Sequence, residues 1–222
     1  MEIKIDEFKQ IFFGELDKVL LPLGFKYIKS QYGYVLKNKE NWYFLFLVDC
    51  TKWSNSIGVQ TKISARNLLL EKTFNEICGT KYKGLKIWGV YPTISDFLGQ
   101  KHPYKIESFL SIYSETDIQK GAEIWLRYFK NIGVPFVEKI TRDKNFALQI
   151  VLENRGVMTY DRHRYLPIMC KEAEMDSKEI EKICVELEKD IDDINKKCPF
   201  DEEFKKRWVE EYYMVKNNIL NG

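Results

Sequence analysis

The stretch WYFLFLV, residues 42–48, contains seven consecutive apolar residues. It is too short for a typical helix, and an uninterrupted apolar run of this length is typical of a strand covered on both faces. Apolar and polar residues alternate before it, from Phe25 to Leu36, and after it, from Ile57 to Ile63, as they do in antiparallel strands with one wet face. The run therefore predicts the inner strand of an antiparallel sheet.

Helical patterns surround this sheet. Residues 5–21 carry apolar side chains at spacings of three and four, with Asp6 available as a cap, and a capping sequence at 114–117 opens a helix that we expect to stop near Gly133. Pro135 is expected to start a further short helix, and additional strands are predicted at 85–91 and 105–113. The remaining helices are predicted at residues 66–78, 145–154, 162–174, 177–196 and 201–220, with Ser177 and Asp201 as caps.

These patterns predict an α+β fold, with an antiparallel sheet packed against helices and a C-terminal all-helical segment. We expect residues 1–156 to form the α+β domain and residues 157–222 a helical extension packed on it. Hydrophobic residues make up 45% of the chain and charged residues 31%, which is typical of a folded globular protein.

The N-terminal residues 1–18 alternate charged and apolar side chains. This pattern predicts neither a signal peptide nor a membrane helix, and we expect a cytoplasmic protein. The five cysteines are odd in number and include neither a CxxC pair nor a cysteine–histidine cluster with zinc spacing, which favours reduced thiols.

Each candidate motif for cofactor binding or hydrolysis lacks residues that the chemistry requires. GTKYKGLK, residues 79–86, has two glycines at phosphate-loop spacing but Leu85 and Lys86 where the loop needs Lys and then Ser or Thr. VDCTK, residues 48–52, lacks the second carboxylate that a hard metal ion would need beside the lysine. The chain has no GxSxG sequence, and a histidine base would have to be His102 or His163. We therefore predict no metal and no cofactor.

Charge argues against nucleic acid as the main partner. The net charge is only +2, although residues 1–170 hold 25 Lys and Arg against 18 Asp and Glu. The basic residues are not clustered, and no RNP-like, KH-like or helix-turn-helix motif is visible. Weak nucleic-acid binding stays open as an alternative.

Residues 16–63 contain the sequence LLPLGF followed by aromatic strands, and residues 114–140 contain an acidic helix start followed by GVPFVEKI. In these features residues 5–150 resemble a bacterial family of unknown function, the domain-of-unknown-function family numbered 4304. The chain departs from that pattern at Asp49 and Cys50, where a glutamine is expected. The family is similar to small proteins encoded near toxin genes, some of which act as immunity proteins, so the resemblance implies a toxin-like protein partner. It brings no catalytic residues.

The polar stretch YDRHRYLP, residues 160–167, has two interpretations. As a helix start, it would place Asp161 at the cap and let its two arginines reach outward to acidic neighbours in the C-terminal segment. As a functional site, Tyr160, Arg162, His163 and Arg164 would form a patch that contacts a partner or an anion, because arginine and tyrosine are enriched at interfaces.

The sequence patterns thus favour a non-catalytic protein-binding module in the cytoplasm, and the resemblance implies an immunity-like role in a bacterium. An enzyme with an unrecognised site is the alternative, because catalytic groups need not lie close together in sequence.

Overall fold

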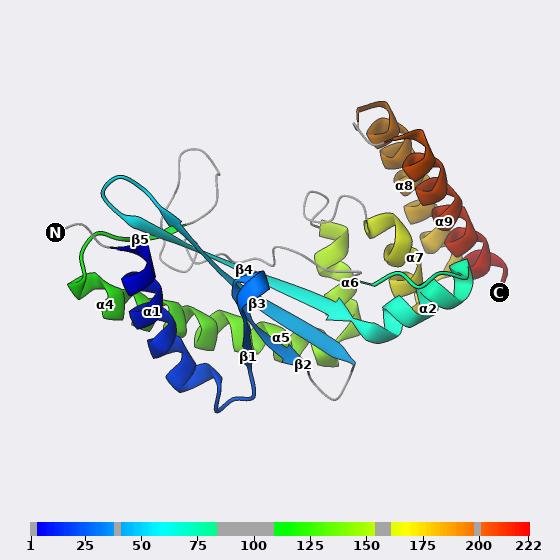
Figure 1. Cartoon of the computed structure of the whole chain (residues 1–222). Coiled ribbons are helices and arrows are strands. Elements are labelled where there is room, and N and C mark those ends of the chain that lie inside the picture. Colours follow the sequence, from blue (N-terminus) through cyan, green and yellow to red (C-terminus); the bar gives the residue numbers. More distant parts are fainter. Residues whose placement is uncertain (1–3, 38–40, 84–108, 154–160, 198–200) are drawn as a thin grey trace. The chain divides into compact units, whose positions relative to one another are not determined.

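The structure is a computed structural model that describes residues 4–37, 41–83, 109–153, 161–197 and 201–222 (Figure 1). It has the predicted α+β fold, an antiparallel sheet with helices and a helical C-terminal part. The chain forms two compact units: unit 1 comprises Met1–Ala65 and Trp88–Lys139, and unit 2 comprises Arg66–Ile87 and Ile140–Gly222. This grouping differs from a division at residue 156, because unit 2 joins two earlier segments of the chain to the C-terminal helices.

The described strands of unit 1 form one sheet in the order β1-β2-β3-β4-β5. Their bounds are Lys26–Ile28 for β1, Gly33–Lys37 for β2, Trp42–Lys52 for β3, Ile57–Asn67 for β4 and Phe109–Ile112 for β5. The predicted inner strand is confirmed, because β3 lies third and its residues Trp42, Phe44, Phe46 and Val48 are buried. Its opposite face is covered less completely than predicted, since Tyr43 and Leu47 are only half-buried.

Aromatic side chains join the sheet to helices α1 (Ile5–Leu20) and α4 (Thr116–Tyr128). Tyr34 on β2 lies opposite Phe46 on β3, so both side chains point to the same face of the sheet. The Tyr34 ring centroid lies 6.5 Å from that of Trp125 on α4, and its hydroxyl donates to the Asp17 carboxylate on α1 at 2.7 Å. The core of unit 1 therefore lies between the sheet and these two helices.

The further short helix predicted at Pro135 is present, but the chain stays helical across Gly133 and does not stop there as predicted. After α4 the chain passes through a π-helical turn, η2 (Phe129–Gly133), directly into α5 (Val134–Arg142). Backbone hydrogen bonding persists across the turn, where Val134 N–H donates to Phe129 O. Gly133 serves close packing here, because a Cβ atom at this position would lie 2.7 Å from the Phe46 ring.

Of the caps predicted at Asp6, Ser177 and Asp201, the first two are also wrong. Lys4 precedes α1, and Asp6 lies in its first turn. Helix α8 (Ser177–Lys197) begins at Ser177, but the carboxylate that accepts from its first turn belongs to Asp176, 2.9 Å from Lys178 N–H. Asp201 is confirmed as the cap of α9 (Glu202–Asn221), because its carboxylate accepts from Phe204 N–H at 2.7 Å.

Unit 2 is built around helix α7 (Arg162–Glu172). It contacts four other helices: α2 (Leu68–Cys78), α6 (Lys144–Glu153), α8 and α9. Every side chain from Arg162 to Cys170 is buried. A polar sequence thus forms the central helix of this unit, and its charged side chains need partners inside the protein.

Several predictions lie outside the described residues. They are the strand at 85–91, part of the strand at 105–113 and the site residue Tyr160. Within the described ranges, no helix combines the length and apolar character that crossing a membrane requires.

Candidate functional site

The predicted site residues lie in the interior of unit 2. Arg162, His163 and Arg164 are 5%, 2% and 3% exposed, and Tyr160 lies outside the described residues. The prediction that the two arginines reach outward is therefore wrong, because neighbouring helices surround α7 on several sides. The expected acidic neighbours are nonetheless present.

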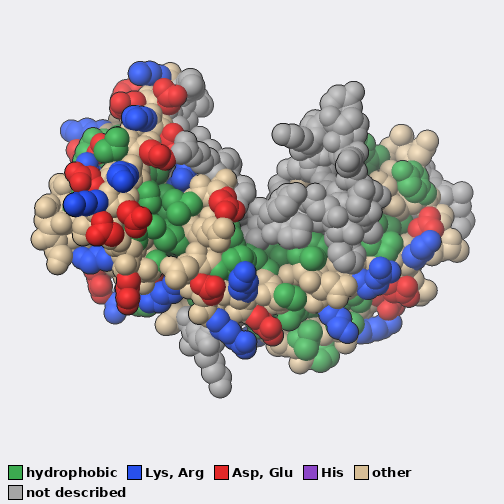
Figure 2. All heavy atoms as spheres, turned by 180° about the vertical axis from the view of Figure 1, so that it is seen from behind, with side chains coloured by type: hydrophobic (Ala, Val, Ile, Leu, Met, Phe, Trp, Pro, Cys, Tyr) green, Lys and Arg blue, Asp and Glu red, His purple; other side chains and the backbone are tan. Residues whose placement is uncertain are grey.

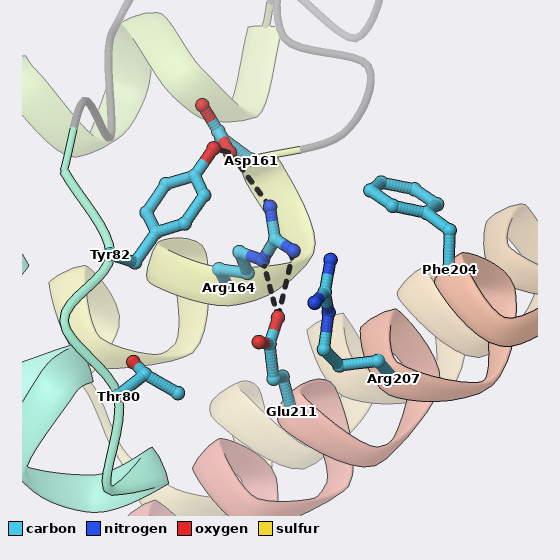
Figure 3. A pocket seen from close by; sticks show the side chains of 7 residues that line it. All are labelled: Thr80, Tyr82, Asp161, Arg164, Phe204, Arg207 and Glu211. Carbon is cyan, nitrogen blue, oxygen red and sulfur yellow. Dashed lines mark hydrogen bonds and ion pairs between the residues drawn. The ribbon is translucent and has the colours of Figure 1, made fainter.

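Arg164 is the centre of an ion-pair cluster (Figure 3). Its Nε and Nη2 atoms donate to Glu211 Oε2 on α9 at 2.8 and 2.7 Å, and its Nη1 lies 3.2 Å from Asp161 Oδ1. The guanidinium carbon lies 4.6 Å from the ring centroid of Tyr82, whose hydroxyl donates to Asp161 Oδ1 at 3.1 Å. One buried cation thus joins α7, α9 and the segment that follows α2.

Asn75 on α2 fixes the segment that carries Tyr82. Its Oδ1 accepts from the Thr80 hydroxyl and from Tyr82 N–H, both at 2.7 Å, and its Nδ2 donates to Tyr82 O at 2.8 Å. Gly79 ends α2 in the left-handed conformation with φ of 63°, which glycine adopts without steric cost. The tyrosine ring is therefore held against Arg164 by local bonds as well as by stacking.

Arg162 and His163 make separate contacts. Arg162 Nη1 lies 3.7 Å from Asp190 Oδ2 on α8. The His163 ring packs edge-on against Trp208, with ring centroids 4.8 Å apart. Burial, assisted by the charges of Arg162 and Arg164, lowers the pKa of His163 from 6.5 to about 4, although the Leu187 backbone acts in the opposite direction. This imidazole is therefore neutral at pH 7.

A cavity of about 400 Å³ opens beside the Arg164 cluster, and we call it the unit 2 pocket (Figure 3). Its lining residues are Thr80, Tyr82, Asp161, Arg164, Phe204, Arg207 and Glu211. Arg207 is exposed, and its guanidinium lies 5.8 Å from the Phe204 ring centroid. Among the described residues it has no ion-pair partner, whereas Arg164 has two. The charge of Arg164 in the pocket wall is thus balanced by carboxylates, whereas the charge of Arg207 is balanced by no described residue.

The sequence did not indicate most of these lining residues. Tyr82 and Glu211 are 129 positions apart, so only the fold brings them together. One signal was present, because Phe204, Arg207 and Glu211 are spaced by three and four and therefore share one face of α9.

Thiol chemistry has no support among the described cysteines. Burial raises the pKa of Cys50 to about 12, of Cys78 to about 11 and of Cys170 to about 12, and it also raises the pKa of Cys184. The thiolate is the reactive form, so burial disfavours reaction of these side chains at neutral pH. The described residues also contain no group of His, Cys, Asp and Glu side chains placed to hold a metal ion.

Surface charge is mixed. Figure 2 shows basic and acidic side chains interspersed on one face of the molecule, with hydrophobic side chains between them. A surface for nucleic acid is typically a stripe of Lys and Arg.

Comparison of the chain with protein families, characterised proteins and solved structures gives no match.

Proposed function

We propose that the protein is a non-catalytic protein-binding module whose unit 2 pocket receives an acidic side chain of its partner. The observation that carries the proposal is Arg207, an exposed guanidinium beside an aromatic wall with no ion-pair partner among the described residues. A guanidinium binds a carboxylate through two parallel hydrogen bonds, which gives direction as well as energy.

The part of the pocket wall formed by Arg164 and Tyr82 is fixed before a partner arrives. Arg164 is held by Glu211 and Asp161, and Tyr82 is held by Asn75 and Asp161. Binding to such a surface loses little side-chain entropy, because the groups are already ordered. Preorganised aromatic and arginine side chains are typical of the residues that dominate interface energies.

Charge balance favours an acidic ligand group at Arg207 rather than deeper in the pocket. The positive charge of Arg164 is offset by two carboxylates, so a further anion placed beside it would meet Asp161 and Glu211. Within the part of the chain that the structure describes, Arg207 has no carboxylate within ion-pair distance. The Phe204 ring can cover the apolar stem of the ligand side chain while its carboxylate binds at Arg207.

Two further considerations support a protein as the partner. The resemblance of residues 5–150 to the bacterial family named above implies an immunity-like role with a toxin-like partner, acting in the cytoplasm. The described cysteines and His163 have pKa values that oppose nucleophilic or acid–base chemistry at neutral pH, which favours binding over catalysis at these groups.

The proposal can be tested by quantitative capture of partners from the source cell. Three baits would be compared: the unchanged protein, Arg207→Ala and Lys206→Ala. Lys206 is the matched control because it adjoins Arg207 on α9, its side chain is 78% exposed and it does not line the pocket. We expect one partner to be retained by the first and third baits and to bind Arg207→Ala about tenfold or more weakly. Equal retention by all three baits would contradict the role of the pocket.

A further inference from the structure

Unit 1 has an apolar pocket of its own, next to the end of α1 and the π-helical turn that follows α4. Its volume is about 410 Å³, within the range of pockets that bind ligands, roughly 300–1000 Å³. We call it the α1–α4 pocket, and it is lined by Val19, Leu23, Leu126, Arg127, Phe129, Lys130 and Val134.

Apolar side chains around this pocket are exposed to an unusual degree. Leu23 is 56% exposed and Val19 42%, while the buried Phe129 ring is a further lining residue. Leu21, in the same turn as Leu23, is 48% exposed. Exposed apolar side chains that gather around one pocket are typical of an interaction site.

The turn that presents Leu23 is well ordered by backbone hydrogen bonds. Leu23 N–H and Phe25 N–H both donate to Leu20 O at 3.1 Å, and Gly24 N–H donates to Leu21 O at 3.0 Å. Gly24 has φ of 88°, a conformation that other residues rarely adopt. The exposed leucine is therefore displayed by a fixed turn and is not a consequence of a frayed helix end.

Two cations accompany the apolar surface. Arg127 and Lys130 are exposed and line the pocket, and neither forms an ion pair with another described residue. The nearby Lys18 differs, because it is bonded to Glu15 at 2.7 Å. The unsatisfied charge at this pocket is thus positive.

We propose that the α1–α4 pocket docks an acidic amphipathic segment of a partner protein, with a bulky apolar anchor inside and Asp or Glu side chains against Arg127 and Lys130. The inference is independent of the proposed function of unit 2. A helix or strand with one apolar face in a groove is a common mode of peptide recognition, and opposite charges at the rim select the partner.

The alternatives fit the same surface less well. A second copy of the chain in a two-fold interface would bring its own Arg127 and Lys130 to the same place, where like charges repel. A lipid bilayer would leave a concave pocket poorly filled. Nucleic acid would gain from the two cations but not from the apolar lining.

A phage-displayed library of random peptides tests the inference. Selection on the unchanged protein, with depletion on Leu23→Ser, should enrich peptides in which a Leu, Phe or Trp is flanked by Asp or Glu. A synthetic fluorescent copy of the most enriched peptide should bind the unchanged protein and lose about tenfold or more in affinity for Leu23→Ser and for Arg127→Glu.

Two control variants show whether a loss of peptide affinity is specific to the α1–α4 pocket. Leu69→Ser changes a leucine that is 50% exposed on α2, in the other unit, and it should leave peptide affinity unchanged. Arg207→Ala, which tests the unit 2 pocket, should also have no effect, so the two proposals can fail separately. Failure to enrich any peptide, or enrichment of basic ones, would overturn the inference. Binding to phosphatidylserine vesicles or self-association that Leu23→Ser abolishes would also overturn it and assign the surface to a membrane or to a second copy.

Discussion

Removing one member of the buried Arg164–Glu211 pair should destabilise unit 2 strongly. The two side chains are 4% and 8% exposed, and their closest N–O distance is 2.7 Å. Breaking a buried pair leaves an uncompensated charge and typically costs about 3–5 kcal/mol of unfolding free energy. For Glu211→Gln we expect about 3 kcal/mol, the lower end of that range, because Asp161 still faces the guanidinium.

The change Arg164→Met should cost more, about 5 kcal/mol, because it leaves the carboxylates of Asp161 and Glu211 close together without a cation. The double change Arg164→Met with Glu211→Leu should cost less than the sum of its parts, since it removes the buried charges of the pair together. Glu210→Gln is the matched control. Glu210 is the neighbouring residue, its side chain is 54% exposed, and its contact with Lys206 at 3.9 Å should contribute less than about 0.5 kcal/mol.

Urea unfolding measured at a local reporter would check these values. The chain forms two compact units, and a global signal would mix the unfolding of one with that of the other. Fluorotryptophan labelling resolves Trp208 of α9, which is 1% exposed, from Trp42 and Trp125 of unit 1. A loss for Glu211→Gln as small as that for Glu210→Gln would refute the assignment of a buried, structurally required ion pair.

Three further outcomes are expected from the structure. The fold lowers the pKa of His163 from 6.5 to about 4, so the folded state favours the neutral ring. This contribution to the free energy of unfolding is present above pH 6.5 and is lost as the pH falls to 4, by up to about 3 kcal/mol. Urea unfolding measured across this pH range should therefore show a smaller loss of stability in His163→Gln than in the unchanged protein. Gly33→Ala should destabilise unit 1 by roughly 1–3 kcal/mol in thermal unfolding, since its Cβ would lie 2.6 Å from the Phe46 carbonyl oxygen on the paired strand; an unchanged melting temperature would exclude this close approach. Gly14→Ala lies inside α1, and apart from the adjoining residues and backbone of that helix no atom lies within 4 Å of the new Cβ. It should instead stabilise the protein by about 0.5–1 kcal/mol, and a loss of stability would show that the site is not open.

The local parts of the fold were predictable from local patterns. WYFLFLV has no polar position for solvent to face, so an inner strand was the consistent interpretation, and Asp201 precedes α9 with the spacing that a capping carboxylate requires. The end of the helix near Gly133 was predicted wrongly, because a glycine can either end a helix or leave space for a neighbouring aromatic ring. The Phe46 side chain, which decides between these roles, comes from a strand more than eighty residues earlier.

The candidate site was predictable only in part. The sequence at 160–167 predicts acidic neighbours for its arginines, and the structure has them, but the burial of Arg162, His163 and Arg164 depends on how many helices pack around α7. Periodicity along one helix does not give that number. Arg207, which carries the proposed function, is one of three consecutive basic residues, and only the fold shows that it lines a pocket while Lys206 does not.

The most direct test of the central claim is a double-mutant cycle on the purified complex with the captured partner. Calorimetric titration would give dissociation constants for Arg207→Ala, for alanine at each partner Asp or Glu in the interface, and for each pair of changes together. We predict that one partner carboxylate couples to Arg207 by more than about 1 kcal/mol, while Lys206→Ala couples to none. Coupling near zero for every carboxylate, with unchanged affinity in Arg207→Ala, would contradict recognition through the unit 2 pocket.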